Sequence, residues 1–512
     1  MLTPSQPRRR WVIAAAVAAL VFLLAPGPGA LAAAEQLPRL ESGKCWFDDP
    51  GEPSARCYRL HVALNRAHSS AGRRAIVLPV VVLPTATVKK LPDPLVYIEG
   101  GPGAETGLDT DGIALWRKDL ASNGIAEGRD LVLFDERGTG RSEPKLDCPE
   151  LVDATVTIYR GRPDVATTNK LWQKASAACR DRLLGDNIDL GAYDSAAIAA
   201  DLDELRHALG YASWNLWAAS YGTRVALVAM RDHPQGLRSV ILDSVYPPEA
   251  EGFVDIGAAT ERVLAKLAAE CAANTPCNGA YPNLAASLDK LQARLDAAPM
   301  PVPVDGADGR RDFFLLDGDR LVEVLIDTFY DWDAIAALPR LIHEAANGND
   351  DRLKEAASTY FNSLLDQTIS DGMALSVTCR EEYPFEQGAP IAAAVKAHPR
   401  FAHLTLTDST LAACPIWGVG RSPAIESQPV TSDVPALLLA GDYDVVTPPY
   451  WAEAAVRHLS HGHLVKFPGI GHGVVASDTC ADAVVAAFLK APREEPKPAC
   501  LARLVGPLFK TR

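Results

Sequence analysis

Short runs of Val, Ile and Leu recur along the chain and predict strands that are buried on both faces. The runs are Ala75–Leu83, Pro94–Ile98, Asp130–Phe134, Trp214–Ala218, Ser239–Leu242, Ala436–Ala440 and His463–Phe467. Longer helical patterns, such as Ser195–Leu209 and Thr223–His233, lie between several of them. An alternation of strand and helix indicates an α/β architecture, with a mainly parallel sheet flanked by helices.

The strand pattern fades between residues 247 and 430, where amphipathic helical patterns replace it. Examples are Ala259–Ala272, Asn283–Leu295 and Leu321–Phe329. The Pro-rich run Pro299–Pro303 is interpreted as a stiff, extended connector within this region. We therefore predict a mostly helical cap domain at 247–430, inserted into a sheet domain formed by 35–246 and 431–512.

The first 34 residues have the pattern of a secretory signal peptide. Arg8–Arg10 are positively charged, Trp11–Ala25 are apolar, and Ala30–Ala32 form an A-x-A cleavage site. A retained transmembrane anchor would need roughly 20 apolar residues, whereas Pro26–Gly29 end the apolar stretch early. The pattern predicts export to the periplasm or the extracellular space, without stable membrane anchoring.

The composition is that of a folded, acidic protein. Of the 512 residues 48% are hydrophobic, and 50 basic residues oppose 64 acidic ones, which gives a net charge of −14. Nucleic-acid binding is disfavoured, because a basic surface is its usual electrostatic requirement. Nothing in the sequence indicates the oligomeric state.

All ten cysteines follow the predicted signal peptide, and an even number in an exported chain indicates disulfides. The sequence does not fix which cysteines pair. Pairing each cysteine with its nearest neighbour would give Cys45–Cys57, Cys148–Cys179, Cys271–Cys277, Cys379–Cys414 and Cys480–Cys500.

No motif indicates a metal or an organic cofactor. The chain has no C-x-x-C, no H-E-x-x-H and no phosphate-binding G-x-x-x-x-G-K-[ST] sequence. Its one His-rich tract, His458, His461 and His463, is interpreted as a solvated turn between a helix and a strand. We therefore expect neither a metal site nor a cofactor site.

Ser220 lies where a predicted strand meets a predicted helix, in the sequence Ala218-Ala219-Ser220-Tyr221-Gly222. This resembles a nucleophile elbow, G-x-S-x-G, with Ala218 in place of the first Gly. Small residues suit such a tight turn, which presents the serine hydroxyl at the end of the sheet. The alternative is that Ser220 is a simple helix N-cap.

Asp444 and His472 each follow a later predicted strand. A serine hydroxyl becomes a nucleophile when a histidine takes its proton, and a carboxylate orients that histidine. The chain order Ser220, Asp444, His472 is that of the α/β-hydrolases. These residues are therefore predicted to form a catalytic triad, although Asp444 in an Asp turn and His472 in a Gly-rich loop have ordinary structural explanations.

An acyl-transfer site also needs backbone N–H groups that stabilise the oxyanion. Tyr221, directly after the serine, is one expected donor. The loop Glu99-Gly100-Gly101-Pro102-Gly103 follows another predicted strand, and Gly101 is the second expected donor.

Several motifs together resemble the prolyl aminopeptidase and tripeptidyl aminopeptidase family of secreted serine exopeptidases. They are Glu99–Gly103, Asp135–Ser142, Ala219–Gly222, Gly441–Pro448, Gly471–His472, Cys379–Glu382 and Cys414–Trp417. The resemblance implies an α/β-hydrolase fold with a helical cap, and release of Pro, other residues or a tripeptide from free peptide N-termini. Two positions depart from the family pattern, because Glu99 replaces a His and Ala218 replaces a Gly.

Family members use Glu residues of the cap to bind the free α-ammonium of the substrate, and a carboxylate is the direct physical partner for that group. The resemblance makes Glu381 and Glu382 the candidates. The alternative is that they are solvated surface. Trp217 and Trp417 are candidates for a Pro-accepting pocket or for the core, and core is favoured. Arg137 is expected to hold its loop in place.

The main alternative function is an esterase or lipase-like hydrolase, because the same triad and oxyanion hole cleave esters, and fold does not fix substrate. A catalytically silent binding protein is the second alternative. Loss of a triad residue, the usual mark of such proteins, is absent here.

Overall fold

A computed structural model describes residues 37–49, 51–66, 74–126, 128–305 and 311–511. The predicted signal peptide lies outside the described residues. From residue 37 onward the chain forms one unit. No helix in the described ranges is both long and apolar enough to cross a bilayer.

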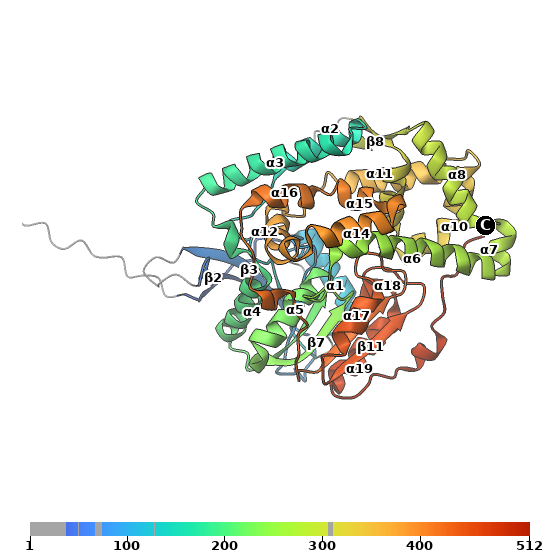
Figure 1. The fold of residues 1–512 in the computed structure, drawn as a ribbon. Coiled ribbons are helices and arrows are strands. Elements are labelled where there is room, and N and C mark those ends of the chain that lie inside the picture. The colour runs from blue at the N-terminus through green and yellow to red at the C-terminus, as the bar shows by residue number, and fades with distance from the viewer. Residues whose placement is uncertain (1–36, 50, 67–73, 127, 306–310, 512) are drawn as a thin grey trace, which may run out of the picture. The chain divides into compact units, whose positions relative to one another are not determined.

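The unit is built on a nine-stranded sheet with the order β1-β2-β3-β5-β4-β6-β7-β10-β11 (Figure 1). The strands are β1 (Arg39–Gly43), β2 (Arg56–Ala63), β3 (Ala75–Leu83), β4 (Leu95–Ile98), β5 (Leu131–Phe134), β6 (Trp214–Ala219), β7 (Leu237–Asp243), β10 (Ala436–Gly441) and β11 (Gly462–Phe467). Pairing is parallel from β5 through β4, β6, β7 and β10 to β11, and antiparallel among β1, β2, β3 and β5. The predicted mainly parallel α/β sheet is confirmed.

Both faces of the sheet are covered. In β3, Val80 and Val82 belong to one hydrophobic cluster, whereas Val81 and Leu83 belong to another. This follows from the period of two along a strand. The helices α4 (Ser195–Leu209) and α5 (Tyr221–Asp232) pack in the first cluster, and α1 (Thr110–Asn123) and α19 (Thr479–Lys490) pack in the second. Burial on both faces explains why the strand sequences are almost continuously apolar.

A mostly helical region separates β7 from β10, as predicted. Its helices are α6 (Gly252–Ala273), α7 (Thr275–Ala280), α8 (Leu284–Ala297), α9 (Gly318–Thr328), α10 (Trp332–Ala346), α11 (Asp351–Ser363), α12 (Asp371–Glu381), α13 (Tyr383–Glu386), α14 (Ala389–Ala397), α15 (His403–Leu406) and α16 (Ser409–Trp417). Many of them share a hydrophobic cluster whose members include Leu291, Leu325 and Phe361.

The interpretation of Pro299–Pro303 as a connector is wrong. Most of this run lies in β8 (Met300–Asp305), which pairs with β9 (Arg311–Leu316) in a two-stranded antiparallel sheet. Each strand of such a pair has a free edge, where proline can lie without removing a ladder hydrogen bond. The alternating Val302 and Val304 are buried, which anchors the hairpin to the helices.

Two helices that precede β6 in sequence pack with the helical region. They are α2 (Pro149–Arg160) and α3 (Val165–Gly185). The helix α3 packs against α16, and α2 packs against β9. In Figure 1, α2, α3 and α16 lie together at the top of the view, and α19 lies at the bottom. The helices α2 and α3 therefore pack with the helical region although they precede it in sequence. The domain boundaries at 246/247 and 430/431 stay a prediction.

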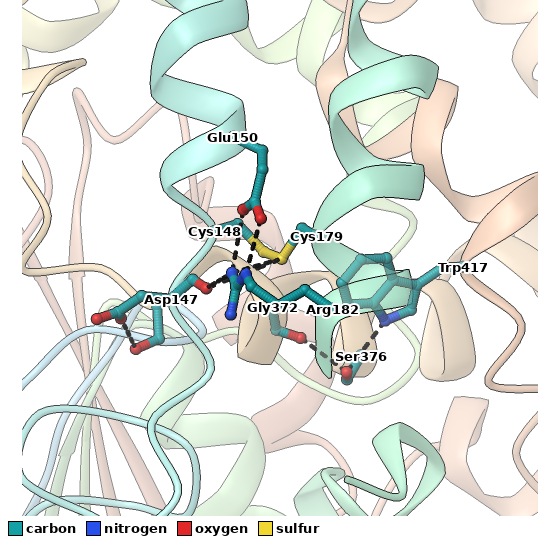
Figure 2. Close-up of a disulfide and its surroundings, with 9 residues drawn as sticks. Asp147, Cys148, Glu150, Cys179, Arg182, Gly372, Ser376 and Trp417 are labelled. Atoms are coloured by element: carbon teal, nitrogen blue, oxygen red, sulfur yellow. Dashed lines mark hydrogen bonds and ion pairs between the residues drawn. A yellow bond between two sulfur atoms is a disulfide. The ribbon is translucent and has the colours of Figure 1, made fainter. Parts of the chain in front are cut away.

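All five nearest-neighbour disulfides are present. Cys148–Cys179 joins the start of α2 to α3, next to an ion pair between Glu150 and Arg182 (Figure 2). Cys379–Cys414 joins α12 to α16. Disulfides therefore join α2 to α3 and α12 to α16. Such bonds restrict the unfolded chain and stabilise the fold.

Candidate active site

Ser220 lies between β6 and α5 in a backbone conformation that residues other than glycine rarely adopt. Its φ is 54° and its ψ is −126°, and such strain is typical of functional turns. A Cβ on Gly222 would lie 2.5 Å from the carbonyl oxygen of Glu99, so the turn needs glycine there. Ser220 occupies the N-cap position, yet its hydroxyl makes no capping hydrogen bond. The geometry is that of an elbow that presents a free hydroxyl.

Asp444 follows β10 and is completely buried. Its Oδ2 lies 2.8 Å from Nδ1 of His472. The N–H groups of Val446 and Thr447 donate to Oδ1 at 2.9 and 2.8 Å, and the Thr447 hydroxyl donates to Oδ2 at 2.7 Å. These contacts fix the carboxylate, which in turn orients the imidazole and favours the tautomer with its proton on Nδ1.

The electrostatics of this pair favour an ionised Asp444. Burial alone would raise the pKa of Asp444, but the charge and hydrogen bond of His472 outweigh it, and the pKa lies below its usual value. Burial alone would lower the pKa of His472, but the charge and hydrogen bond of Asp444 outweigh it, and the pKa is raised. The imidazole is therefore a stronger base than it would be in isolation.

We expect kcat/KM to depend on pH through His472. A protonated imidazole cannot accept a proton from the serine, so kcat/KM should rise with pH and level off above the raised pKa, at a midpoint above 6.5. The measurement is kcat/KM for one amide substrate from pH 5 to 9. Asp444→Asn should move the midpoint to lower pH, because it removes the negative charge. An unchanged midpoint in that variant would contradict the assignment.

Asp243, at the end of β7, ties the serine turn to the histidine loop. Its backbone carbonyl accepts a hydrogen bond from the Ser220 N–H at 2.9 Å. Its carboxylate accepts from the N–H groups of Val474 and Val475, at 2.9 Å each, directly after His472. In the part of the chain that the structure describes, no hydrogen bond joins the Ser220 hydroxyl to His472. Such bonds are often long in unliganded enzymes.

Asp243 was missed in the sequence, although an acidic residue at the end of a buried strand was a usable signal. Burial raises its pKa to about 6, and the two amide hydrogen bonds oppose that rise.

The loop at Gly101 approaches the serine closely. A Cβ on Gly100 would lie 2.9 Å from the Ser220 Cβ, and Gly101 has a φ of 109°. Gly101 is exposed and Ser220 is partly exposed, so this corner is open to solvent. Tyr221 is the first residue of α5, where backbone N–H groups have no partner within the helix. The residue before Gly101 thus packs against Ser220, and Tyr221 directly follows Ser220 in the chain.

Glu99 gives this loop a second support. Its Oε1 accepts hydrogen bonds from the Gly100 N–H at 2.8 Å and from the Tyr97 hydroxyl at 3.2 Å. The Gly100 amide is therefore turned toward Glu99, which leaves the next amide, that of Gly101, for the oxyanion.

We expect Glu99→Ala to lower kcat by about tenfold, because the loss of a roughly 1.4 kcal/mol hydrogen bond loosens the loop. Glu99→Gln retains an acceptor oxygen and should stay within about threefold of the wild type. Steady-state kinetics on one amide substrate measure both values. If Glu99→Gln lowers kcat as much as Glu99→Ala, or if only KM changes in these variants, Glu99 does not position the loop.

Glu381 does not lie at an open mouth of the site. Its side chain is 1% exposed and pairs with Arg224, whose Nε lies 3.0 Å from Oε2. The N–H and the hydroxyl of Ser195 also donate to its carboxylate, both at 2.6 Å. Glu381 therefore links α12 to α4 and α5, and its position does not support the expected role in substrate binding. The alternative of solvated surface is wrong as well.

Glu382 is buried too, but one of its oxygens lacks a partner. The Tyr246 hydroxyl donates to Oε2 at 2.5 Å, whereas Oε1 has no hydrogen bond in the described structure. Glu386 is similar: its Oε2 accepts from the N–H groups of Phe253 and Val254, and its Oε1 is unpartnered. Burial raises the pKa of Glu386 to about 9, and the charge of Glu382 adds to the effect. Among the described residues neither carboxyl forms an ion pair with a Lys or Arg, although the charge of Arg224 acts on Glu382.

A chain of hydrogen bonds connects Glu382 to the backbone of the serine. The Tyr246 N–H donates to the Thr223 hydroxyl at 2.7 Å, and that hydroxyl donates to the Ser220 carbonyl at 2.6 Å. The Tyr246 ring stacks on Trp451 with centroids 5.1 Å apart. Glu386 was missed in the sequence, where its spacing of four from Glu382 was the available signal.

The remaining candidates are structural. Trp217 and Trp417 are 8% and 1% exposed and belong to two hydrophobic clusters. Arg137 is fully buried and pairs with Asp201 at 2.7 Å, so it holds its loop in place as expected. Of the His-rich tract, His458 and His461 lie between α17 (Pro449–Val456) and β11, as expected, whereas His463 lies within β11.

The described residues contain one group at metal-ligand spacing, namely Cys148, Glu150 and Cys179. Its two sulfurs are bonded to each other, so they are not available to a metal ion.

Two known families match segments of this chain that contain the candidate triad residues. Residues 93–299, which include Ser220, match the alpha/beta hydrolase fold family, and residues 400–500, which include Asp444 and His472, match a family described as TAP-like protein.

Serine protease Hip1 of Mycobacterium tuberculosis (strain H37Rv) is 26% identical over 425 residues, which cover 77% of this chain and 78% of that protein. Tripeptidyl aminopeptidase of Streptomyces lividans is 30% identical over 176 residues, which cover 33% of this chain and 31% of that protein. Carboxylesterase B of Mycobacterium tuberculosis (strain CDC 1551) is 28% identical over 234 residues, which cover 44% of this chain and 43% of that protein.

Proposed function

We propose that this chain, which carries an α/β-hydrolase domain and a TAP-like domain, is an exported serine exopeptidase. It releases Pro, other residues or a tripeptide from the free N-termini of peptides. The observation that carries the proposal is the hydrogen-bonded path from Ser220 through Thr223 and Tyr246 to Glu382. Glu382 and the nearby Glu386 each have one buried carboxylate oxygen without a partner in the described structure. The five disulfides support an oxidising compartment, the periplasm or the exterior.

The reaction proceeds through an acyl-enzyme. Nε2 of His472 takes the proton of the Ser220 hydroxyl while the oxygen attacks the scissile carbonyl. The N–H groups of Gly101 and Tyr221 stabilise the oxyanion. His472 then gives its proton to the leaving amine, and water, activated by the same imidazole, releases the acyl group from the serine. Asp444 stabilises the imidazolium in both steps.

The carboxyl pair selects a free N-terminus. An α-ammonium placed against Glu382 and Glu386 gives both unpartnered oxygens a donor and favours the ionised form of both carboxyls, including Glu386 with its raised pKa. An acetylated N-terminus has no positive charge and leaves the carboxyls uncompensated. This requirement distinguishes an exopeptidase from an esterase that uses the same triad.

We expect the wild type to hydrolyse Ala-Ala-Pro, Ala or Pro chromogenic amides with a free N-terminus at least about 100-fold faster than the acetylated forms. Glu382→Gln and Glu386→Gln should each raise KM for the free form about tenfold or more, because an ion pair is lost. Glu355→Gln, an exposed change on α11, is the charge-matched control. Equal rates on free and acetylated forms would refute the exopeptidase assignment.

A carboxylesterase is the second candidate, and the similarity to carboxylesterase B favours it. Hydrolysis of a short acyl ester without hydrolysis of any peptide amide would support it in place of the exopeptidase.

A further inference from the structure

A cavity of about 680 Å³ lies among the helices α2, α3, α9, α11 and α15. Its volume falls within the range of sites that hold small ligands, roughly 300 to 1,000 Å³. It is separate from the pair Glu382 and Glu386, neither of which lines it. The triad and the N-terminus site therefore do not account for this cavity.

The walls of this cavity continue to the active site on two sides. Ile369 and Asp371 line the cavity, and the N–H of Ser370 between them donates to the carbonyl of Gly103, in the loop of the expected oxyanion donor, at 2.8 Å. On the other side, α9 contributes Glu323 to the lining.

The chain directly after α9 reaches the catalytic histidine. The carbonyl of Phe329 accepts from the His472 N–H at 3.0 Å, and the ring of Tyr330 lies 4.8 Å from the imidazole, centroid to centroid. Two segments that line the cavity therefore run on to residues that contact the Gly103 loop and His472.

The cations of the cavity are already occupied. Arg162 pairs with Asp296 and Asp317 at 3.0 Å each. Arg320 donates to four backbone carbonyls and lies over the ring of Tyr159. Among the described residues neither guanidinium forms an ion pair with Glu323 or Asp371, although the charge of Arg320 acts on Glu323.

Two carboxylates of the lining lack a cationic partner. Oε2 of Glu323 accepts hydrogen bonds from the hydroxyls of Tyr159 and Tyr360 at 2.8 and 3.1 Å, and no Lys or Arg pairs with it among the described residues. Asp371 likewise has no ion pair or side-chain hydrogen bond there. Burial raises the pKa of Glu323 against the opposing charges of His403 and Arg320. Burial and the charge of Asp147 raise the pKa of Asp371 to about 7. Both carboxyls would be stabilised by a cation.

A buried histidine adds a free acceptor to the same cavity. The side chain of His403 is 8% exposed, and its Nδ1 lies 3.2 Å from Oδ1 of Asp319. With Nδ1 donating to that carboxylate, Nε2 of the neutral ring is an acceptor, and it has no partner in the described structure. An unpartnered buried acceptor indicates a ligand that donates hydrogen bonds.

The spacing of these groups disfavours a metal ion. Among the described residues the carboxylates and the imidazole of the cavity do not form a group at metal-ligand spacing. A long organic cation can contact separated acceptors in turn, and an ammonium or guanidinium supplies several N–H donors.

We propose that this cavity binds the basic side chain of a Lys or Arg residue of the peptide substrate, with Glu323 and Asp371 as its carboxylate partners. This rests on the proposed exopeptidase function, since it assigns a side-chain preference to the same active site. The α-ammonium remains at Glu382 and Glu386.

The test compares peptides that differ by one charge. Peptides with free N-termini carry Lys or the uncharged norleucine at one position at a time, on either side of the scissile bond. We expect the wild type to prefer Lys at one position by about tenfold or more in kcat/KM. Glu323→Gln and Asp371→Asn should each reduce that preference at least about threefold and leave hydrolysis of the norleucine peptide unchanged. Glu355→Gln should retain the full preference.

A binding measurement makes the test independent of catalysis. Calorimetry on Ser220→Ala protein should show the Lys peptide binding about tenfold more tightly than the norleucine peptide, and Glu323→Gln in that background should remove the difference. Equal kcat/KM and equal affinity for the two peptides at every position would overturn the proposal. So would variants that lose discrimination between free and acetylated N-termini, because the cavity would then bind the α-ammonium.

The failures of the two proposals are distinguishable. If no free N-terminal peptide is cleaved, the exopeptidase proposal fails, and the binding experiment still decides whether the cavity recognises a basic side chain.

Discussion

Ser220→Ala is expected to lower kcat for peptide hydrolysis by at least about 10⁴-fold, the largest effect of any single substitution in this chain. The variant lacks the oxygen that forms the acyl-enzyme, so only oxyanion stabilisation and substrate positioning remain, and loss of a nucleophilic serine is known to cost up to about 10⁶-fold. The measurement is kcat on a chromogenic amide with a free N-terminus.

The fold should tolerate this change. The Ser220 hydroxyl makes no capping hydrogen bond. Its replacement by alanine therefore removes no contact that stabilises the helix start. Thermal unfolding of the variant should therefore match the wild type within a few degrees. Ser287→Ala, on α8, is the matched control and should retain full activity. A variant that is folded and retains more than about 1% of the activity would exclude Ser220 as the nucleophile.

Asp444→Asn is expected to lower kcat by about 10⁴-fold. The side-chain amide occupies the same space, but it carries no charge, and its NH₂ group favours the imidazole tautomer with its proton on Nε2, which cannot accept the proton of the serine. Because the carbonyl oxygen of Asn retains the contacts of Oδ1 with the N–H groups of Val446 and Thr447, substrate binding and KM should change little.

The control for this variant comes from the same loop. Asp442 follows β10 as well, where its carboxylate pairs with Lys266 and accepts from the Gly469 N–H. Asp442→Asn should cost less than about tenfold in kcat, because Asp442 does not contact the imidazole. A mild effect of Asp444→Asn combined with a severe effect of Asp243→Asn would show that the acid is supplied from the end of β7.

Much of the sheet follows from local sequence. The strands β3, β4, β5, β6, β7, β10 and β11 were all predicted to within two residues at each end, because burial on both faces makes their sequences continuously apolar. The strands β1 and β2 lie at the antiparallel edge and mix exposed with buried positions, as in Arg56 and Arg59 of β2, so they lack that pattern. The strand β8 was missed for a different reason. Its prolines argue against a strand in general, but β8 has an unpaired edge, where proline is tolerated.

The candidate triad could be located because its residues are chemically distinctive and each follows a buried strand. The substrate site could not be located in the same way. Whether Glu381 or Glu382 has a free oxygen depends on Ser195, Arg224 and Tyr246, which are distant in sequence. Sequence spacing alone carries no information about which carboxylate a distant arginine neutralises.

The most direct test of a serine exopeptidase is labelling with a peptidyl diphenyl phosphonate, Ala-Ala-Pro in sequence, with a free or an acetylated N-terminus. The Ser220 oxygen attacks phosphorus and displaces phenoxide, which leaves a covalent adduct that intact-mass and peptide mass spectrometry can locate. We expect one adduct per chain, on Ser220, formed much faster from the probe with the free N-terminus. An adduct on another residue, or equal rates of labelling by both probes, would contradict this function.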